Sequence, residues 1–157
     1  MKRTALTRQA PHVWPFSHGT VVEGPARLVF LAGQVAYDRH GPDRRLVGVG
    51  DPAAQARQAI ENMRTLLRQA GGDLSDVVEM TAYLTDPAAH TEAMGRVAQE
   101  YFRDPFPAMS LIGVSALARP EFLVEIRAIA AIPLRRPAGP TRRAPRPARR
   151  PSARRRR

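Results

Sequence analysis

The chain has 157 residues and no cysteine, which excludes disulfide bonds, cysteine metal sites and thiol nucleophiles. Its formal net charge of +11 is unevenly distributed, because eleven of the 25 basic residues lie in residues 134–157, which contain no acidic residue. Residues 1–133 are therefore neutral, with 14 basic and 14 acidic residues. This length favours one domain with one core, which we assign to residues 1–133.

The N-terminal part predicts strands separated by loops. Residues 1–9 and 20–23 are candidates for short strands, and the Pro- and Gly-containing residues 11–19 predict a loop. Residues 28–36 form an apolar run of strand length. Residues 37–50 contain several Gly and Pro residues, which indicate an exposed loop.

Two Asp-Pro pairs, at 51–52 and 86–87, predict helix starts, because Asp caps free amides and Pro is tolerated at the first helical position. Apolar residues recur at helical spacing after each pair. The first helix should end at Gly71 and Gly72, and the second before the prolines at 105 and 107. Between the helices, residues 78–84 alternate in polarity and predict a strand.

Two further apolar strands are expected near the C-terminus of the domain, joined by a short polar turn at residues 119–121. The second of them contains Glu125, a carboxylate in an otherwise apolar strand. Such a charge is costly to bury unless it is paired or functional. Arg127 lies on the same strand face, so a structural ion pair between these two residues is the alternative to a functional role.

The order of elements predicts an α+β fold with a mixed six-stranded sheet and two helices on one face. The other face of this sheet would remain open and partly apolar. Such a face is expected to be buried against another surface, most simply a second copy of the chain.

Residues 134–157 form an Arg- and Pro-rich tail without apolar periodicity. We expect this tail to be disordered, because it cannot bury enough surface to offset its ordering entropy. Its arginines would attract phosphate regardless of sequence, so weak nucleic-acid binding is one alternative and a tolerated basic extension is the other. No apolar run approaches the roughly 20 residues of a membrane span, and nothing resembles a signal peptide, so we expect a cytoplasmic protein without a membrane partner.

Several segments resemble, in the same order, the RidA/YjgF family of imine/enamine deaminases. They are Phe16-Ser17-His18, the apolar run 28–34 ending in Ala-Gly-Gln, Pro107-Ala-Met-Ser110, and Val124-Glu-Ile126. The resemblance extends over residues 10–133. It implies a chorismate-mutase-like fold and a barrel-like homotrimer with ligand pockets at the subunit interfaces.

The resemblance also implies roles for individual residues. Glu125 matches the glutamate that orients water in the family, Gly33 matches a backbone position lining the pocket, and Phe16 matches a bordering tyrosine without its hydroxyl. His18, in the same motif as Phe16, is a further candidate for contact with the substrate.

Three residues depart from the family pattern, and each replaces a polar residue of the family's pocket with an apolar one. Met109 stands where the family usually has an arginine, Ala32 replaces a common serine, and Gly95 falls where many members have an asparagine. An arginine binds a substrate carboxylate with two parallel hydrogen bonds, and methionine offers only an apolar surface. We therefore expect weak or absent activity on 2-iminopropanoate and 2-iminobutanoate.

The remaining candidates for substrate contact are Ser110 and Leu111, which follow Met109, and Arg127. Arg119 or Arg127 would have to replace the missing cation if one is needed. No metal site is expected, because the four histidines show no ligand spacing, and the resemblance implies no cofactor.

Three functions remain open. The first is imine/enamine hydrolysis, giving a carbonyl compound and ammonia, with altered substrate choice. The second is non-catalytic binding of a small molecule on the same scaffold. The third is nucleic-acid binding through the tail.

Overall fold

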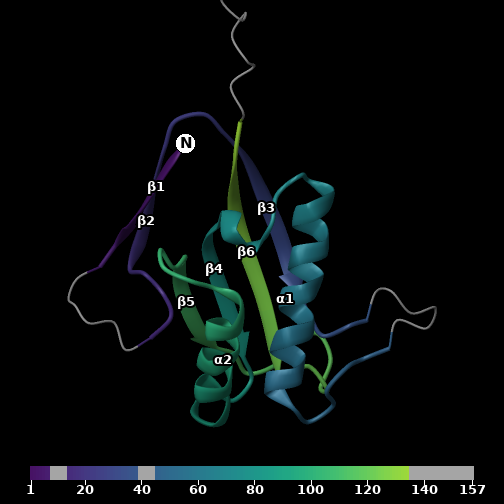
Figure 1. The fold of residues 1–157 in the computed structure, drawn as a ribbon. Helices are drawn as coiled ribbons and strands as arrows, with labels where there is room; N and C mark the ends of the chain where they lie inside the picture. The colour runs from purple at the N-terminus through teal and green to yellow at the C-terminus, as the bar shows by residue number, and fades with distance from the viewer. Residues whose placement is uncertain (8–13, 39–44, 135–157) are drawn as a thin grey trace, which may run out of the picture.

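The computed structural model describes residues 1–7, 14–38 and 45–134 (Figure 1). The chain forms strands and helices in an order that matches the one predicted. They are β1 (Lys2–Leu6), β2 (Gly19–Glu23), β3 (Ala26–Gln34), α1 (Pro52–Gln69), the 3₁₀ helix η1 (Leu74–Asp76), β4 (Val77–Leu84), α2 (Pro87–Tyr101), β5 (Ala108–Gly113) and β6 (Val124–Pro133). The predicted tail from 135 onward, and the histidines at 12 and 40, lie outside the described residues.

The predicted strands are present, but they are divided between two sheets. A four-stranded mixed sheet has the order β3-β6-β4-β5, and β1 and β2 form a separate antiparallel pair. A single isolated bridge between Ser17 and Ala108 connects the segment before β2 to β5. The Ala108 amide also donates to Thr20 Oγ1 at 3.2 Å, so the two-stranded sheet is attached beside β5.

A turn is present at residues 119–122, where the Phe122 amide donates to the Arg119 carbonyl at 3.1 Å, but it does not join the last two strands directly, as was expected. Strand β4 lies between β5 and β6, pairing in parallel with β5 and antiparallel with β6. Residues 114–123 therefore pass across the end of β4, where Val114 donates its amide to Leu84 and Thr85 donates its amide to Leu123. Alternating polarity identified both strands correctly, but it carries no information about which strands pair.

Both helices begin at the predicted Asp-Pro pairs. Asp51 Oδ1 accepts hydrogen bonds from the amides of Ala53 at 2.9 Å and Ala54 at 3.0 Å. Asp86 Oδ1 accepts one from Ala89 at 3.0 Å. These bonds satisfy amides that have no partner in the first turn of a helix, which is why Asp precedes each helix.

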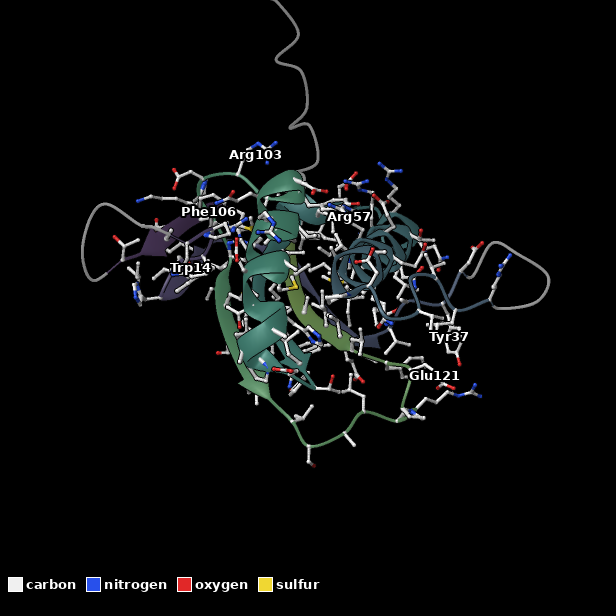
Figure 2. All side chains as sticks on the ribbon, turned by 90° about the horizontal axis from the view of Figure 1, so that it is seen from below. Trp14, Tyr37, Arg57, Arg103, Phe106 and Glu121 are labelled. Atoms are coloured by element: carbon white, nitrogen blue, oxygen red, sulfur yellow. The ribbon has the colours of Figure 1, made fainter. Side chains whose placement is uncertain are left out.

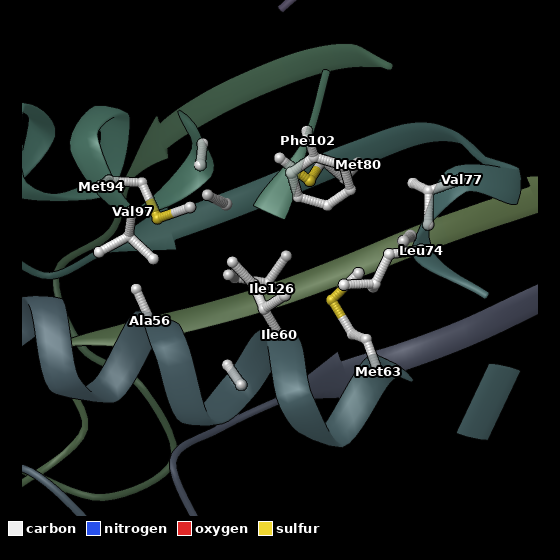
Figure 3. Close-up of a cluster of buried hydrophobic side chains, with 14 of the residues drawn as sticks. Ala56, Ile60, Met63, Leu74, Val77, Met80, Met94, Val97, Phe102 and Ile126 are labelled. Atoms are coloured by element: carbon white, nitrogen blue, oxygen red, sulfur yellow. The ribbon is translucent and has the colours of Figure 1, made fainter. Parts of the chain in front are cut away.

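Both helices cover the same face of the four-stranded sheet, with α1 over β3 and β6 and α2 over β4 and β5 (Figure 1). Figure 3 shows the apolar core between these layers. In β6 the residues of one face, including Val124, Ile126 and Ala128, are buried in this core. The alternate residues, Glu125 and Arg127, therefore point to the face that the helices leave uncovered.

The buried side chain of Gln55 forms hydrogen bonds with two loops at one end of the sheet. The Gln55 side chain, which is fully buried in α1, donates to the carbonyls of Gly48 and Glu121 at 3.1 and 2.8 Å. Its Oε1 accepts from the Leu123 amide at 2.8 Å. The network fixes the segment just before β6 and thereby the start of the strand that carries Glu125.

The uncovered sheet face exposes large apolar side chains. Phe30 on β3 is 70% exposed and Leu28 is 55% exposed, and both alternate with Val29 and Leu31, which pack on the core. Ile112 on β5 is also exposed on this face. In the part of the chain that the structure describes, no helix is long and apolar enough to cross a membrane.

Candidate functional site

A pocket of about 230 Å³ lies between α2, β5 and the segment before β2. Four of the residues predicted to contact a substrate line it. They are Phe16, Gly95, Met109 and Leu111. Its other lining residues are Trp14, Pro15, Thr91, Met94 and Ala98. The structure thus brings together a substantial part of the predicted site, from segments far apart in the sequence.

Among the described residues, no charged side chain lines this pocket. Within the same residues, Thr91 carries the only side-chain hydroxyl of the lining, and its Oγ1 atom already donates to the carbonyl oxygen of Pro87 at 2.6 Å. Met109 is half-buried at the position where an arginine was expected from the family pattern. The described part of the lining therefore provides apolar contact surface and no cation that could hold a carboxylate.

Trp14 lies directly on helix α2 at Gly95 (Trp14 is labelled in Figure 2). A Cβ atom on Gly95 would be 2.8 Å from Cζ3 and 3.1 Å from Cε3 of the indole. Any side chain at this position would have to displace the ring. The glycine therefore makes room for an aromatic wall.

Glu125 lies against the backbone of Gly33 on the other face of the sheet. A Cβ atom on Gly33 would be 1.8 Å from Glu125 Oε1, so only glycine leaves space for this carboxylate. The pairing of β3 with β6 shifts register between Leu31 and Gln34, which brings Gly33 next to Glu125. Gly33 and Glu125, which were each expected at the site, therefore lie next to one another.

Gln34 stabilises the backbone around Gly33. Its Nε2 donates to the carbonyl oxygens of Ala32 at 3.0 Å and Gly33 at 3.3 Å. Its Oε1 is buried without a hydrogen-bond partner in the described residues. Ala32 itself is exposed, and its carbonyl oxygen is bonded to the Gln34 side chain.

Glu125 and Met109 belong to opposite faces of the sheet within one chain. Met109 is in register with Met80, whose side chain is buried under the helices, and Glu125 is in register with Tyr83 on the alternate face. Because side chains alternate along a strand, the two cannot enter one cavity from the same side. The candidate site therefore consists of an apolar half and a carboxylate half.

The other predicted contact residues lie outside the apolar pocket. Ser110 and Arg127 are exposed on the uncovered face, both in register with Thr81. His18 is exposed, with its ring centroid 5.6 Å from that of Phe16 at an interplanar angle of 68°. Among the described ion pairs, none joins Arg127 to Glu125.

Arg119, considered as a substitute for the missing arginine, also lies away from the pocket. Its guanidinium carbon is 5.9 Å from the centroid of the Tyr37 ring. The Tyr37 ring in turn packs edge-on against Phe122, with centroids 5.3 Å apart. Arg119 thus contacts the aromatic residues beside the connection between β5 and β6.

Sequence reasoning missed part of the pocket lining. Trp14 lies in a segment that its prolines marked only as a loop, and Met94 and Ala98 belong to a helical stripe that was assigned to the core. Stripe periodicity cannot separate core from pocket, because both are apolar. Within the described residues, no three His, Asp or Glu side chains are grouped so that they could hold a metal ion.

These features define a small α+β protein with an apolar pocket at one sheet edge and a strand carboxylate on the open sheet face. Residues 7–132 match the family model described as endoribonuclease L-PSP. A RutC family protein of Pyrococcus abyssi is 35% identical over 130 residues, covering 82% of this chain and 96% of that protein.

Solved structures agree with the sequence match. A Rid family protein of Yersinia pestis, described as of unknown function, has a TM-score of 0.72 and 34% identity, covering 84% of this chain and 100% of that one. RidA from an Antarctic Psychrobacter has a TM-score of 0.56 and 30% identity, covering 78% and 92% of the two chains. The chain therefore belongs to the RidA/YjgF family.

Proposed function

We propose that this protein is an imine/enamine deaminase, which hydrolyses a C=N bond to a carbonyl compound and ammonia. The observation that carries the proposal is the Glu125 carboxylate, held against the Gly33 backbone on an otherwise apolar strand. A carboxylate at a fixed place can orient a water molecule and accept its proton. The resemblance of its motifs to those of the RidA/YjgF imine/enamine deaminases supports the proposal.

The reaction needs one proton acceptor and no redox partner. Glu125 takes a proton from water as the oxygen bonds to the imine carbon, and it passes this proton to the imine nitrogen. The second proton of the water then moves by way of the carboxylate to the same nitrogen. The C–N bond breaks, and ammonia leaves as the carbonyl forms.

We further propose that a second copy of the chain completes each site within a homotrimer. The apolar half and the carboxylate half lie on opposite faces of one chain, so one molecule supplies Met109 and its neighbour supplies Glu125. The exposed side chains of Leu28, Phe30 and Ile112 give the uncovered sheet face the apolar character of a contact surface.

Non-catalytic binding of a small molecule is the second candidate. The uncharged lining around Met109 favours it, because the residues that the structure describes in this half of the site include no acid, base or nucleophile that is free for chemistry. Such a protein would bind a ligand in the pocket, and imines would hydrolyse at the same rate with and without the protein.

The test measures the decay of freshly generated imines with the full chain. The panel contains 2-iminobutanoate, 2-imino-3-phenylpropanoate and the imine of phenylacetaldehyde, and the readout is the loss of semicarbazone formation. We expect acceleration of at least one of them, and a loss of at least about 100-fold in Glu125→Gln, the range of a general base.

Glu61→Gln is the matched control, because Glu61 is a carboxylate on α1 that pairs with Arg64 at 2.7 Å and does not line the pocket. It should keep the activity of the parent chain. Acceleration that survives Glu125→Gln would contradict the proposed role of this residue. A chain that binds the products but accelerates no imine would favour the binding protein, and cleavage of RNA in a parallel assay would contradict the deaminase.

A further inference from the structure

The apolar half of the site determines which imines fit. Its described lining contains two thioethers and two aromatic rings, and the one side-chain hydroxyl among these residues is already bonded to the helix backbone. A carboxylate placed against these described residues would lose its water without gaining a partner, which strongly disfavours a charged group. An uncharged group loses little hydration free energy when it moves from water into the pocket.

The side chains that line the pocket favour a ligand with a flat ring. Trp14 and Phe16 approach the pocket from the segment before β2, and Met94 and Met109 approach it from α2 and β5. Methionine sulfur makes favourable contacts with aromatic rings and adapts to their outline. Gly95 extends the wall, because its missing side chain lets the indole of Trp14 lie on the helix.

The volume agrees with a ligand of that kind. The pocket measures about 230 Å³, and an apolar cavity of about 150 Å³ is enough to hold a benzene molecule. A phenyl group with a short side arm therefore fits, and the C=N carbon of that arm would lie at the pocket mouth.

We propose that the substrates are uncharged imines and enamines that carry an aryl group and lack a carboxylate. This inference rests on the proposed deaminase function for its chemistry, but not for its binding preference. For an aldimine, water adds to the C=N carbon, and the C–N bond breaks to give one aldehyde and one ammonia. The atoms balance without an oxidant, reductant or metal.

Binding can be measured apart from catalysis, because Trp14 is the only tryptophan of the chain. Its fluorescence is titrated with phenylacetamide and with phenylacetate, which have nearly the same shape and differ in charge. We expect phenylacetamide to bind at least about tenfold more tightly. Equal affinity, tighter binding of phenylacetate, or binding of neither compound would overturn the inference.

Met109→Arg should reverse this preference by placing a cation in the pocket. Gln69→Arg is the matched control, since it adds the same charge at the exposed end of α1, and it should keep the preference of the parent chain. If Met109→Arg does not fold, the comparison of the two compounds on the parent chain still decides the question.

Turnover is then compared for two imines that differ only by the carboxylate. Monoamine oxidase generates the imine of phenylacetaldehyde from 2-phenylethylamine, and an L-amino-acid oxidase generates 2-imino-3-phenylpropanoate from phenylalanine. We expect the first to have the higher kcat/KM, by at least about tenfold. Preference for the second refutes the inference and leaves the deaminase intact, whereas selective binding without turnover of either refutes the deaminase alone.

Discussion

The carboxylate of Glu125 occupies the space that a side chain at Gly33 would need. A Cβ atom on Gly33 would lie 1.8 Å from Oε1, 2.6 Å from Cδ and 2.9 Å from Cγ of Glu125. The two residues come from β3 and β6, which are neighbours in the sheet although they are far apart in the sequence. The position of the proposed water-orienting group therefore depends on a glycine that has no chemistry of its own.

Gly33→Ala should remove imine hydrolysis by moving this carboxylate. We expect kcat/KM to fall at least about tenfold, with a loss of about 1–3 kcal/mol in stability from overpacking. Kinetics and urea unfolding on the same sample separate the two effects. Gly19→Ala is the control, since its Cβ would make an ordinary contact 3.4 Å from Leu6. Full activity of Gly33→Ala would show that catalysis does not depend on the position of the Glu125 carboxylate against Gly33.

Gly95→Ala should change the pocket without harming the fold. Alanine improves the helix by up to about 1 kcal/mol, and Trp14, which is 44% exposed, can swing away from the new methyl group. We expect an unchanged or slightly higher Tm, a red-shifted Trp14 emission, and phenylacetamide binding weakened at least about tenfold. Unchanged emission and affinity would contradict the contact between Trp14 and Gly95.

Phe30→Glu should dissociate the proposed trimer. The residue is 70% exposed on the sheet face that the helices leave uncovered, so a charge there would have to be buried between copies. Val49→Glu is the matched control, because Val49 is also 70% exposed but precedes α1 and lies outside the sheet. Mass in solution, measured by light scattering, should fall in the first variant only. A monomeric mass for the parent chain would contradict the proposed trimer.

Asp73→Asn should weaken the fold near neutral pH and have less effect in acid. Partial burial by itself raises the pKa of Asp73, but the hydrogen bonds from the Leu74 amide and from Arg68, with the nearby charge of Arg64, lower this pKa below its usual range. A lowered carboxyl pKa contributes stability above the unfolded-state value, about 3.9, and loses it as the pH falls through the folded-state value.

The contribution is small, because the side chain is 43% exposed and solvent screens it, so we expect a loss of less than about 1 kcal/mol in Asp73→Asn. Urea unfolding at about pH 7 and about pH 3 should show a smaller difference between variant and parent at the lower pH. A difference that grows in acid would mean that the charge of Asp73 does not stabilise the fold.

Much of the secondary structure followed from local patterns. Asp51 and Asp86 predicted both helix starts correctly, because capping depends on residues within one turn. The apolar residues that recur at helical spacing after Asp86 predicted an amphipathic helix, and Met94, Val97 and Ala98 are buried on one face of α2. The family and its fold were also recognisable, because matching segments occur in a fixed order along the chain.

The arrangement of the strands was not predictable in the same way. The turn expected at residues 119–121 is present, but it does not join two neighbouring strands, because β4 inserts between β5 and β6. Polarity alternates along a strand whichever neighbour it has, so it cannot reveal pairing order. Contacts between segments far apart in the sequence also decide that the six strands form a four-stranded sheet and a two-stranded one.

The sequence by itself determined the helices, the strands, the family and the loss of the expected arginine at Met109, since each of these depends on residue types and their local spacing. Only the tertiary structure decided that Trp14 lies on Gly95 and that Glu125 lies on Gly33. It also decided that Met109 and Glu125 occupy opposite sheet faces. These relationships arise from packing between distant segments, in which close approach of atoms rather than local periodicity selects the neighbours.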